Sequence, residues 1–299
     1  MEKQLIGRGV LAGAFAGLVT FVFARIFAEP VIQRAIDYES ARDAMQDKLD
    51  KAAGLAVPAA GPDIFSRTIQ ADVGIGAGLI LFGAAMGALV AVAYVVCIGR
   101  TGGIRPRPLA MLVPAFFFLG LYLVPFAKYP ANPPAVGHED TIRDRGALYL
   151  ILAFCSCLGL FLAVYFGQKL KAHGGLSTQT VCVLMGVGYV AVMGVLFAIL
   201  PPLGHLHTNV VEYGRHATET PLPLTDPQGN IVFPGFPADV LAQFRIYSVA
   251  AQVILWTVLA LTFAPLAERV LDPEAARGRR VSPVEGGALA PASKPHPAG

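Results

Sequence analysis

Histidine and acidic side chains that could bind a metal ion gather between the apolar stretches of this sequence. Two of them, His205 and His207, stand two residues apart just after the pair Pro201-Pro202. Two prolines favour an extended chain, in which residues i and i+2 share a side, so both imidazoles could face one ion. Imidazole and carboxylate together suit borderline divalent cations such as cobalt, nickel, zinc or copper. We therefore predict that this pair of histidines binds a divalent metal ion.

Three further residues extend this candidate metal site. If Thr208 caps a short helix, Glu212 and His216 stand one turn apart on one face of that helix. His138 precedes two acidic residues in another polar segment. The alternative interpretation is that all of these are solvated loop side chains, because their spacing matches no fixed metal motif. The candidate ligands are His205, His207, Glu212, His216 and His138.

Long apolar stretches separate these polar segments. Of the 299 residues, 55% are hydrophobic and only 14% are charged, against about 25% charged in an average soluble domain. A helix needs roughly 20 apolar residues to cross a bilayer, and lipid offers an open backbone no hydrogen-bond partner. We therefore predict an all-α, polytopic membrane protein with about six transmembrane helices. The predicted spans are 5–27, 73–98, 109–126, 147–167, 180–200 and 246–266.

The remaining segments are too short to fold as separate soluble domains. Residues 1–271 are therefore predicted to form a single transmembrane domain. Within it, apolar positions among the charges of residues 31–53 favour an amphipathic helix that continues outward from the first span. Residues 272–299 are rich in Pro, Ala, Gly and Arg and are predicted to be a disordered tail.

The positive charges indicate an orientation in the membrane. Six spans put both termini on one side, together with short loops that carry Arg and Lys. Short basic loops stay in the cytoplasm, so both termini are predicted to be cytoplasmic. The long segments 28–72, 127–146 and 201–245 would then face outward.

Glycines recur every four residues in two of the spans. The first span has Gly9, Gly13 and Gly17, and the second has Gly83 and Gly87. Small residues at this spacing let helix backbones approach closely. We expect close packing inside the bundle; the alternatives are a contact between subunits and a mobile pair of helices.

Several functional classes lack support in this sequence. It contains no phosphate-binding loop, no His-Glu-x-x-His and no Gly-x-Ser-x-Gly motif. A net charge of +3 is too small to suggest nucleic-acid binding. We predict that the chain is not an enzyme, has no catalytic residues and binds no permanent cofactor.

Several segments resemble a known family. The opening Leu11-Ala-Gly-Ala-Phe-Ala-Gly17 leads to Glu29-Pro30-Val31-Ile32. The central Tyr129-Pro-Ala-Asn-Pro-Pro-Ala-Val-Gly137 runs into Arg145-Gly-Ala-Leu-Tyr149, and Phe236-Pro237-Ala238-Asp239 precedes Phe244-Arg245. Together they resemble the CbtA family, the proposed cobalt transporter subunit of bacteria, over roughly residues 5–268. The central proline-rich stretch is the most specific part.

The resemblance implies a multi-pass subunit of the bacterial inner membrane, linked to cobalt uptake for cobalamin synthesis. It also implies a small partner, CbtB, a single-span protein with its own histidine motif. The family is described with five spans, one fewer than the six counted here. The resemblance supplies no ligand residues, so the candidate ligands rest on the residues of this chain alone.

Two hypotheses follow from the residues and the resemblance. In the first, the chain takes up a divalent metal, with Co²⁺ as the transported ion and outer histidines and carboxylates as its capture site. In the second, it is a non-transporting membrane scaffold that docks a small metal-binding partner. In both, its surroundings are the lipid bilayer and a CbtB-like subunit, with a homo-oligomer as a further option and no nucleic acid.

Overall fold

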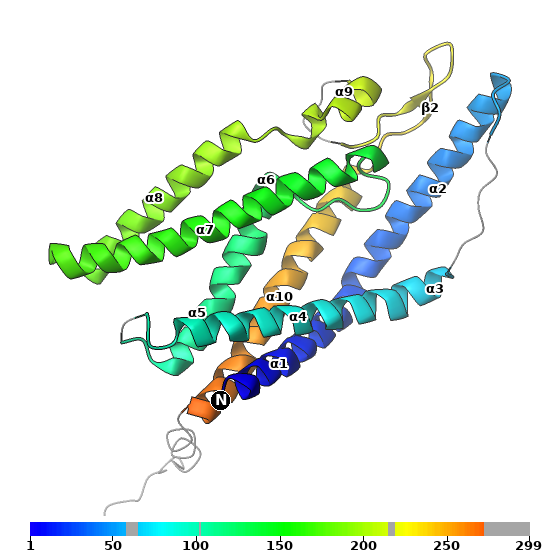
Figure 1. The fold of residues 1–299 in the computed structure, drawn as a ribbon. Coiled ribbons are helices and arrows are strands. Elements are labelled where there is room, and N and C mark those ends of the chain that lie inside the picture. The colour runs from blue at the N-terminus through cyan, green and yellow to red at the C-terminus, as the bar shows by residue number, and fades with distance from the viewer. Residues whose placement is uncertain (58–64, 102, 215–218, 272–299) are drawn as a thin grey trace, which may run out of the picture.

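Six helices in the described part of the chain are long and apolar enough to cross a membrane (Figure 1). The computed structural model describes residues 1–57, 65–101, 103–214 and 219–271. The predicted all-α class and number of spans are confirmed, while the predicted tail, 272–299, lies outside the described residues. The elements are α1 (Glu2–Phe23), η1 (Ala24–Ala28), α2 (Glu29–Ala52), α3 (Arg67–Ile69), η2 (Gln70–Gly74), α4 (Ile75–Cys97), α5 (Pro106–Phe117), η3 (Phe118–Leu123), α6 (Val124–Lys128), η4 (Glu139–Thr141), α7 (Ile142–Gly174), α8 (Thr178–Ile199), η5 (Leu203–His205), α9 (His207–Tyr213), β1 (Leu224–Thr225), β2 (Ile231–Phe233) and α10 (Ala238–Leu271).

The first helix runs from the membrane span into the polar segment that follows it. A π-helical turn, η1, joins α1 to α2 without a break. Val31, Ala35 and Tyr38 are buried on one face of α2, at the spacing of three and four residues that a helix face requires. They pack against the start of α10. This confirms the predicted amphipathic helix that continues out of the first span.

The third span contains a proline and still continues as a helix. Pro114 lies inside α5, where it removes one backbone hydrogen bond. The π-helical turn η3 follows, and α6 extends the helix to Lys128. Such local adjustments are how membrane helices accommodate proline. The run Pro106–Lys128 is one of the six candidate spans and contains the predicted span 109–126.

α1 and α4 touch backbone to backbone along a line of glycines. Gly9 and Gly13 of α1 face Gly83 and Gly87 of α4. A Cβ atom at Gly13 would overlap the carbonyl oxygen of Gly83. Only glycine fits such a crossing, which confirms the predicted close packing and places it inside the bundle.

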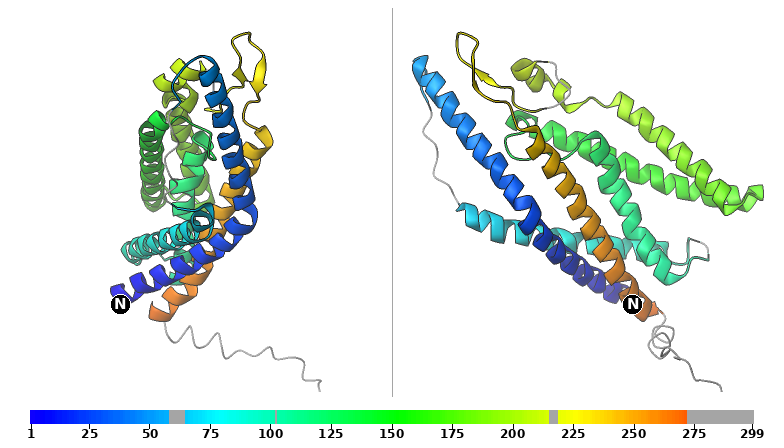
Figure 2. Two further views of the ribbon diagram at one scale, coloured as in Figure 1. Left: turned by 90° about the vertical axis from the view of Figure 1, so that its right-hand side faces the viewer. Right: turned by 180° about the vertical axis from the view of Figure 1, so that it is seen from behind.

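The spans form two layers. α1, α4, α5 and α10 surround the main core, in which the buried rings of Tyr94 and Phe263 meet edge to face. α7 and α8 form a hairpin beside this layer (Figure 2). α7 contacts the first layer chiefly through η3 and α6, whereas α8 packs mainly on α7. Only 6% of the candidate span in α8 is buried within the described chain.

The connecting segments divide between two ends of the bundle. The start of α1 and the end of α10 lie together, where Arg8 donates to the carbonyl oxygen of Leu266 (2.6 Å). The opposite end, which we call the distal end, holds the far end of α2, α9, the segment 129–141 and an antiparallel β1–β2 hairpin (Figure 1). This division agrees with the predicted grouping of the long segments on one side. Which side faces the cytoplasm stays a prediction.

Candidate functional site

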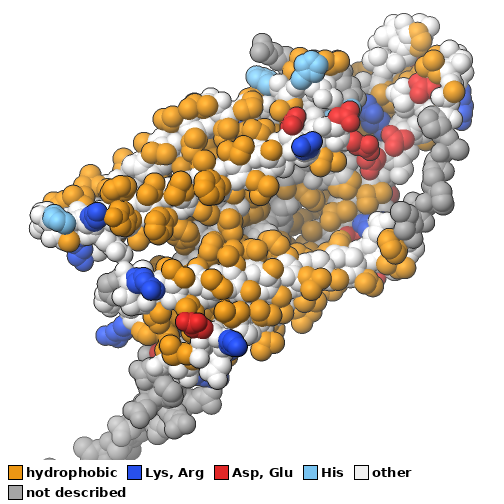
Figure 3. All heavy atoms as spheres, viewed as in Figure 1, with side chains coloured by type: hydrophobic (Ala, Val, Ile, Leu, Met, Phe, Trp, Pro, Cys, Tyr) orange, Lys and Arg blue, Asp and Glu red, His pale blue; other side chains and the backbone are white. Residues whose placement is uncertain are grey.

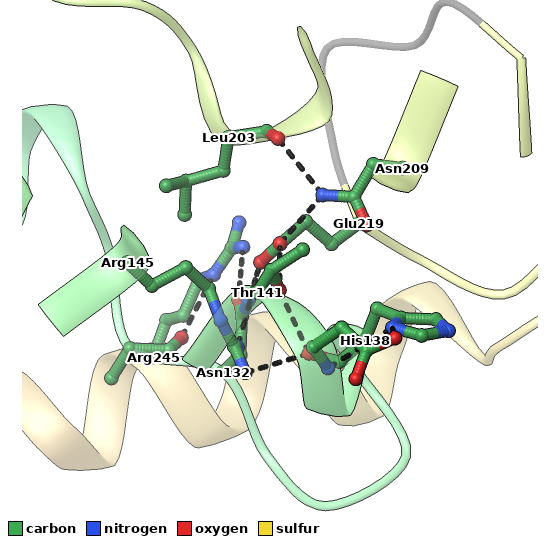
Figure 4. A network of polar contacts seen from close by, with 10 residues as sticks. Asn132, His138, Thr141, Arg145, Leu203, Asn209, Glu219 and Arg245 are labelled. Carbon is green, nitrogen blue, oxygen red and sulfur yellow. Dashed lines mark hydrogen bonds and ion pairs between the residues drawn. The ribbon is translucent and has the colours of Figure 1, made fainter. Parts of the chain in front are cut away.

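The distal end is organised around one buried carboxylate, Glu219. Its side chain is 0% exposed. One oxygen accepts hydrogen bonds from the Asn209 amide (2.7 Å) and the Thr141 hydroxyl (3.1 Å) (Figure 4). The other accepts from the Asn132 amide (3.3 Å) and lies 3.5 Å from the guanidinium of Arg145. The carboxylate thus joins the proline-rich segment, the start of α7 and α9.

Burial makes this network important for the structure. An ionised carboxylate is costly to bury unless it is both hydrogen-bonded and paired with a charge. Glu219 has both kinds of partner, and its backbone carbonyl also accepts from the N–H of Gly137 (3.2 Å). Asn209 is itself buried and donates as well to the carbonyl of Leu203 (2.9 Å). The segments at this end therefore depend on Glu219 for their relative positions.

A second arginine joins the network without a carboxylate of its own. Arg245 of α10 donates to the carbonyl of Ala131 (3.3 Å) and to the Asn132 amide oxygen (3.0 Å) (Figure 4). Within the described residues it forms no ion pair. The network therefore holds two guanidinium groups against one carboxylate.

A separate basin at the distal end collects negative charge. It has a volume of about 290 Å³ and lies between α2 and the residues that lead into α7. Four carboxylates and one guanidinium line it, together with His138. Figure 3 shows acidic and histidine side chains gathered at this end, while the surfaces of the spans are apolar. The charged lining residues are Glu39, Arg42, Asp43, Glu139 and Asp140.

The carboxylates of this basin disfavour one another's charge. Partial burial raises the pKa of Glu39, and the nearby carboxylates of Asp43 and Glu139 raise that pKa further. His138 lies beside them, and its Nδ1 accepts the backbone N–H of Asp140 (3.1 Å). A cation entering the basin would relieve this repulsion.

The basin is not a preformed chelate. Within the described residues, no group of three or more His, Cys, Asp and Glu side chains is arranged to hold a metal ion. The basin can therefore attract a divalent cation by charge. Tight coordination would require its exposed side chains to move or further ligands to arrive.

The predicted pair His205 and His207 does not lie on an extended strand. His205 ends the 3₁₀ turn η5, closed by its N–H to the carbonyl of Pro202 (3.0 Å), and His207 begins α9. The extended-chain expectation was wrong because the turn forms directly after the second proline. Both side chains are exposed, and α9 contacts η4 beside the basin. Whether they bind metal stays a prediction.

The predicted helical pairing of Glu212 with His216 also changes. α9 contains Glu212 but ends at Tyr213, and Gly214 follows with a φ of 75°. His216 lies outside the described residues. Leu206 rather than Thr208 occupies the N-cap position, with no side-chain cap. Among the predicted ligands that the structure describes, His138 is the one that lies in the carboxylate-lined basin.

Sequence reasoning missed Glu219 and its partners, although one signal pointed to them. Asn132, Arg145 and Arg245 all fall in segments that carry the family resemblance. These segments are far apart in the chain and meet only at this carboxylate. In this chain, the segments that carry the resemblance thus meet at one packing site.

One family of known proteins matches this chain. A family model described as a probable cobalt transporter subunit (CbtA) matches residues 2–268, nearly the whole chain. No curated protein and no solved structure matches the chain. The matched range contains all six candidate spans up to the last turn of α10, the Glu219 network and the basin. The chain belongs to the CbtA family of probable cobalt transporter subunits.

Proposed function

We propose that this chain is the membrane-spanning subunit of a system that imports Co²⁺ across the bacterial inner membrane for cobalamin synthesis. Both termini would be cytoplasmic, so the distal end would face outward and meet the ion first. The observation that carries the proposal is the basin in which His138 lies with four carboxylates at that end.

The charge of the basin supports a role in capture. Opposite charge concentrated in a recess raises the local concentration of a cation and its rate of association. Burial is the main cause of the raised pKa of Glu39, and the carboxylates of Asp43 and Glu139 raise it further, so a bound cation would relieve part of this cost. Imidazole nitrogen from His138 would favour cobalt over magnesium or calcium, which prefer oxygen ligands.

Further ligands would complete the coordination. The exposed His205 and His207 lie at the same end. His205 precedes α9 and His207 begins it, and α9 contacts η4. With Glu212 and His216 they remain our proposed additional ligands from this chain. A CbtB-like single-span partner with its own histidines could supply others, which fits a basin without a preformed group of three ligands.

The test of capture is Co²⁺ binding by the purified chain, measured calorimetrically. The double variant Glu39→Gln with Asp43→Asn removes two charges from the basin and keeps side-chain size. We expect its affinity to fall by about tenfold or more, the effect of roughly 1.4 kcal/mol. The matched control is Asp37→Asn on the same helix, outside the basin lining, which should bind as the wild type does.

A second pair of variants separates the two groups of candidate ligands. His138→Ala removes the imidazole of the basin, and His205→Ala with His207→Ala removes the exposed pair. Each should weaken Co²⁺ binding if both groups coordinate the ion, whereas His173→Ala, at the other end of α7, should not. Wild-type affinity in every basin variant would exclude the basin as the capture site.

A membrane scaffold that docks a metal-binding partner is the second candidate function. The family description names a transporter subunit, which fits a chain that acts together with a partner. Co²⁺ flux in liposomes distinguishes the two. Flux through the purified chain alone indicates a carrier, flux only with the partner indicates a subunit, and metal binding without flux in either case indicates a scaffold.

A further inference from the structure

A large cavity lies between the two layers of helices, apart from the acidic basin. It has a volume of about 590 Å³ and is lined by α4, η3, α6, the segment 129–132, the start of α7 and the middle of α10. In the space-filling view the surface is hollowed between the α7–α8 hairpin and α4 (Figure 3). This recess has no part in the capture site proposed above.

The charge of this cavity is opposite to that of the basin. Arg145 is the one charged residue in its lining, which contains no carboxylate. Arg145 is paired with Glu219. Arg245 donates to the Asn132 amide oxygen and forms no ion pair among the described residues. The Glu219 network beside this wall of the cavity therefore holds two guanidinium groups against one carboxylate, which favours an anion in the cavity over a cation.

Two buried hydrogen-bond donors without partners among the described residues also favour an anion near this cavity. The Arg145 Nε and the Tyr122 hydroxyl are buried without a hydrogen-bond partner in the described part of the chain. Both residues line the cavity. Buried donors are seldom left unpaired in proteins, so the wall beside Arg145 and Tyr122 has a capacity to donate hydrogen bonds that the described chain does not use.

The rest of the lining is apolar and lies deeper in the bundle. Phe82 and Met86 are near the middle of the second candidate span, and Trp256 is near the middle of α10. Arg145 stands one turn into α7, close to the distal end. A ligand that fits this cavity has an anionic head near Arg145 and an apolar body that reaches toward the middle of the bundle.

We propose that this cavity binds a phospholipid with an anionic headgroup, whose phosphate contacts Arg145 and whose acyl chain lies along Phe82, Met86 and Trp256. The bilayer around the bundle supplies such a molecule, and its charge balances the second guanidinium. The bound lipid fills the recess between the layers and holds the α7–α8 hairpin against α4.

The one tryptophan of the chain, Trp256, reports on this cavity directly. Its side chain is only 4% exposed, so lipids outside the bundle have little access to it. The purified chain is reconstituted in vesicles of phosphatidylcholine that contain increasing fractions of brominated phosphatidylglycerol or brominated phosphatidylcholine. Bromine on an acyl chain within contact of the indole quenches its fluorescence.

We expect brominated phosphatidylglycerol to quench Trp256 at a lower mole fraction than brominated phosphatidylcholine. Arg145→Gln should abolish this preference. Because Arg145 also supports Glu219, a second variant leaves that network intact: Gly146→Leu puts a side chain into the cavity, where a Cβ atom meets no atom within 4 Å. It should lower quenching by both lipids, whereas Gly78→Leu, outside the lining on α4, should change neither.

Three results would overturn the proposal. The first is equal quenching by the two lipids in the wild type. The second is a preference for phosphatidylglycerol that Arg145→Gln retains, together with quenching that Gly146→Leu leaves unchanged. The third is loss of the preference when inorganic phosphate is added at low concentration, which would mean that the cavity holds a free anion and not a lipid.

Discussion

At the scale of single residues, Glu219 has the largest structural effect in the distal end. Its carboxylate receives hydrogen bonds from three segments and pairs with Arg145. Removing one partner of a buried charge pair leaves the other charge uncompensated. This lowers the stability of the fold more than replacing both partners with apolar side chains. The geometry therefore depends on the negative charge as well as on the shape of this side chain.

We expect Glu219→Gln to destabilise the chain. The variant keeps the length of the side chain but leaves Arg145 without a counter-charge, a loss of about 3 kcal/mol or more for a buried pair. The measurement is thermal unfolding of the purified protein in detergent. Asp37→Asn, which changes an exposed carboxylate on α2, is the control and should unfold as the wild type does. Unfolding of Glu219→Gln at the wild-type temperature would show that the network contributes little.

The carboxylates of the basin lead us to predict that metal binding depends on pH. Because the pKa of Glu39 is raised in the free protein, a proton competes with Co²⁺ at higher pH than at an ordinary carboxylate. Affinity should thus be full near neutral pH and fall as pH decreases, beginning above the usual carboxylate pKa of about 4.3. Calorimetry at a series of pH values measures this. Glu39→Gln should bind more weakly at neutral pH and lose less affinity on acidification, and an unchanged pH profile would contradict the assignment.

At the scale of elements, the contact between α1 and α4 brings two helix backbones directly together. The glycines leave no space for a side chain, so the two backbones pack directly and gain dispersion contacts along their length. α1 also packs on α10, so this contact positions the whole first layer.

We expect Gly13→Leu to disrupt the fold. Its side chain would meet the carbonyl oxygen of Gly83 and the Cα of Gly87, and backbone atoms cannot move aside without separating the helices. Size-exclusion chromatography in detergent should show low yield and aggregation. Gly7→Leu on the same helix is the matched control, because a Cβ atom there meets nothing within 4 Å. Equal behaviour of the two variants would argue against the packing account.

The elements that could be predicted from sequence are those that the bilayer constrains. An apolar run of about 20 residues is stable in lipid as a membrane-spanning helix, so the six spans followed from composition. The outward extension of the first helix followed from the apolar positions among the charges after the first span. The glycine contact followed from spacing alone. The Glu219 network could not be predicted in this way, because its members stand at positions 132, 141, 145, 209, 219 and 245 and their meeting depends on how the helices pack.

The polar segments were harder to predict for a local reason. Two prolines are compatible with an extended chain and also with the entry to a tight turn, and at Pro202 the chain turns. That choice decides whether His205 and His207 face the same way. The position of His138 beside α2 could not be predicted either, because it depends on the long first helix reaching the segment before α7.

At the scale of the whole molecule, the two ends of the bundle differ in charge. The four carboxylates of the basin lie at the distal end. Short loops with Arg and Lys lie at the end that holds the start of α1 and the end of α10, and the rule for short basic loops predicts that this end is cytoplasmic. The proposed direction of uptake runs from the acidic end to the basic end.

The orientation has a direct test. A reporter fused after Leu271 should read cytoplasmic, and one inserted next to Gln228, in the turn of the β-hairpin, should read external. The β1–β2 hairpin lies at the distal end, and Leu271 ends α10 at the opposite end of the bundle. Reports from the same side would show that the number of membrane crossings differs from six.

The most direct test of the central claim is the initial rate of radioactive Co²⁺ uptake into right-side-out membrane vesicles that contain the chain and its partner. With limiting Co²⁺, the variant Glu39→Gln with Asp43→Asn should take up the ion several-fold more slowly than the wild type, while Asp37→Asn does not. With saturating Co²⁺ the double variant should recover, because the basin concentrates the ion and does not form the path across the membrane. Wild-type uptake by the double variant at limiting Co²⁺, with normal amounts of protein in the vesicles, would contradict capture at the distal basin.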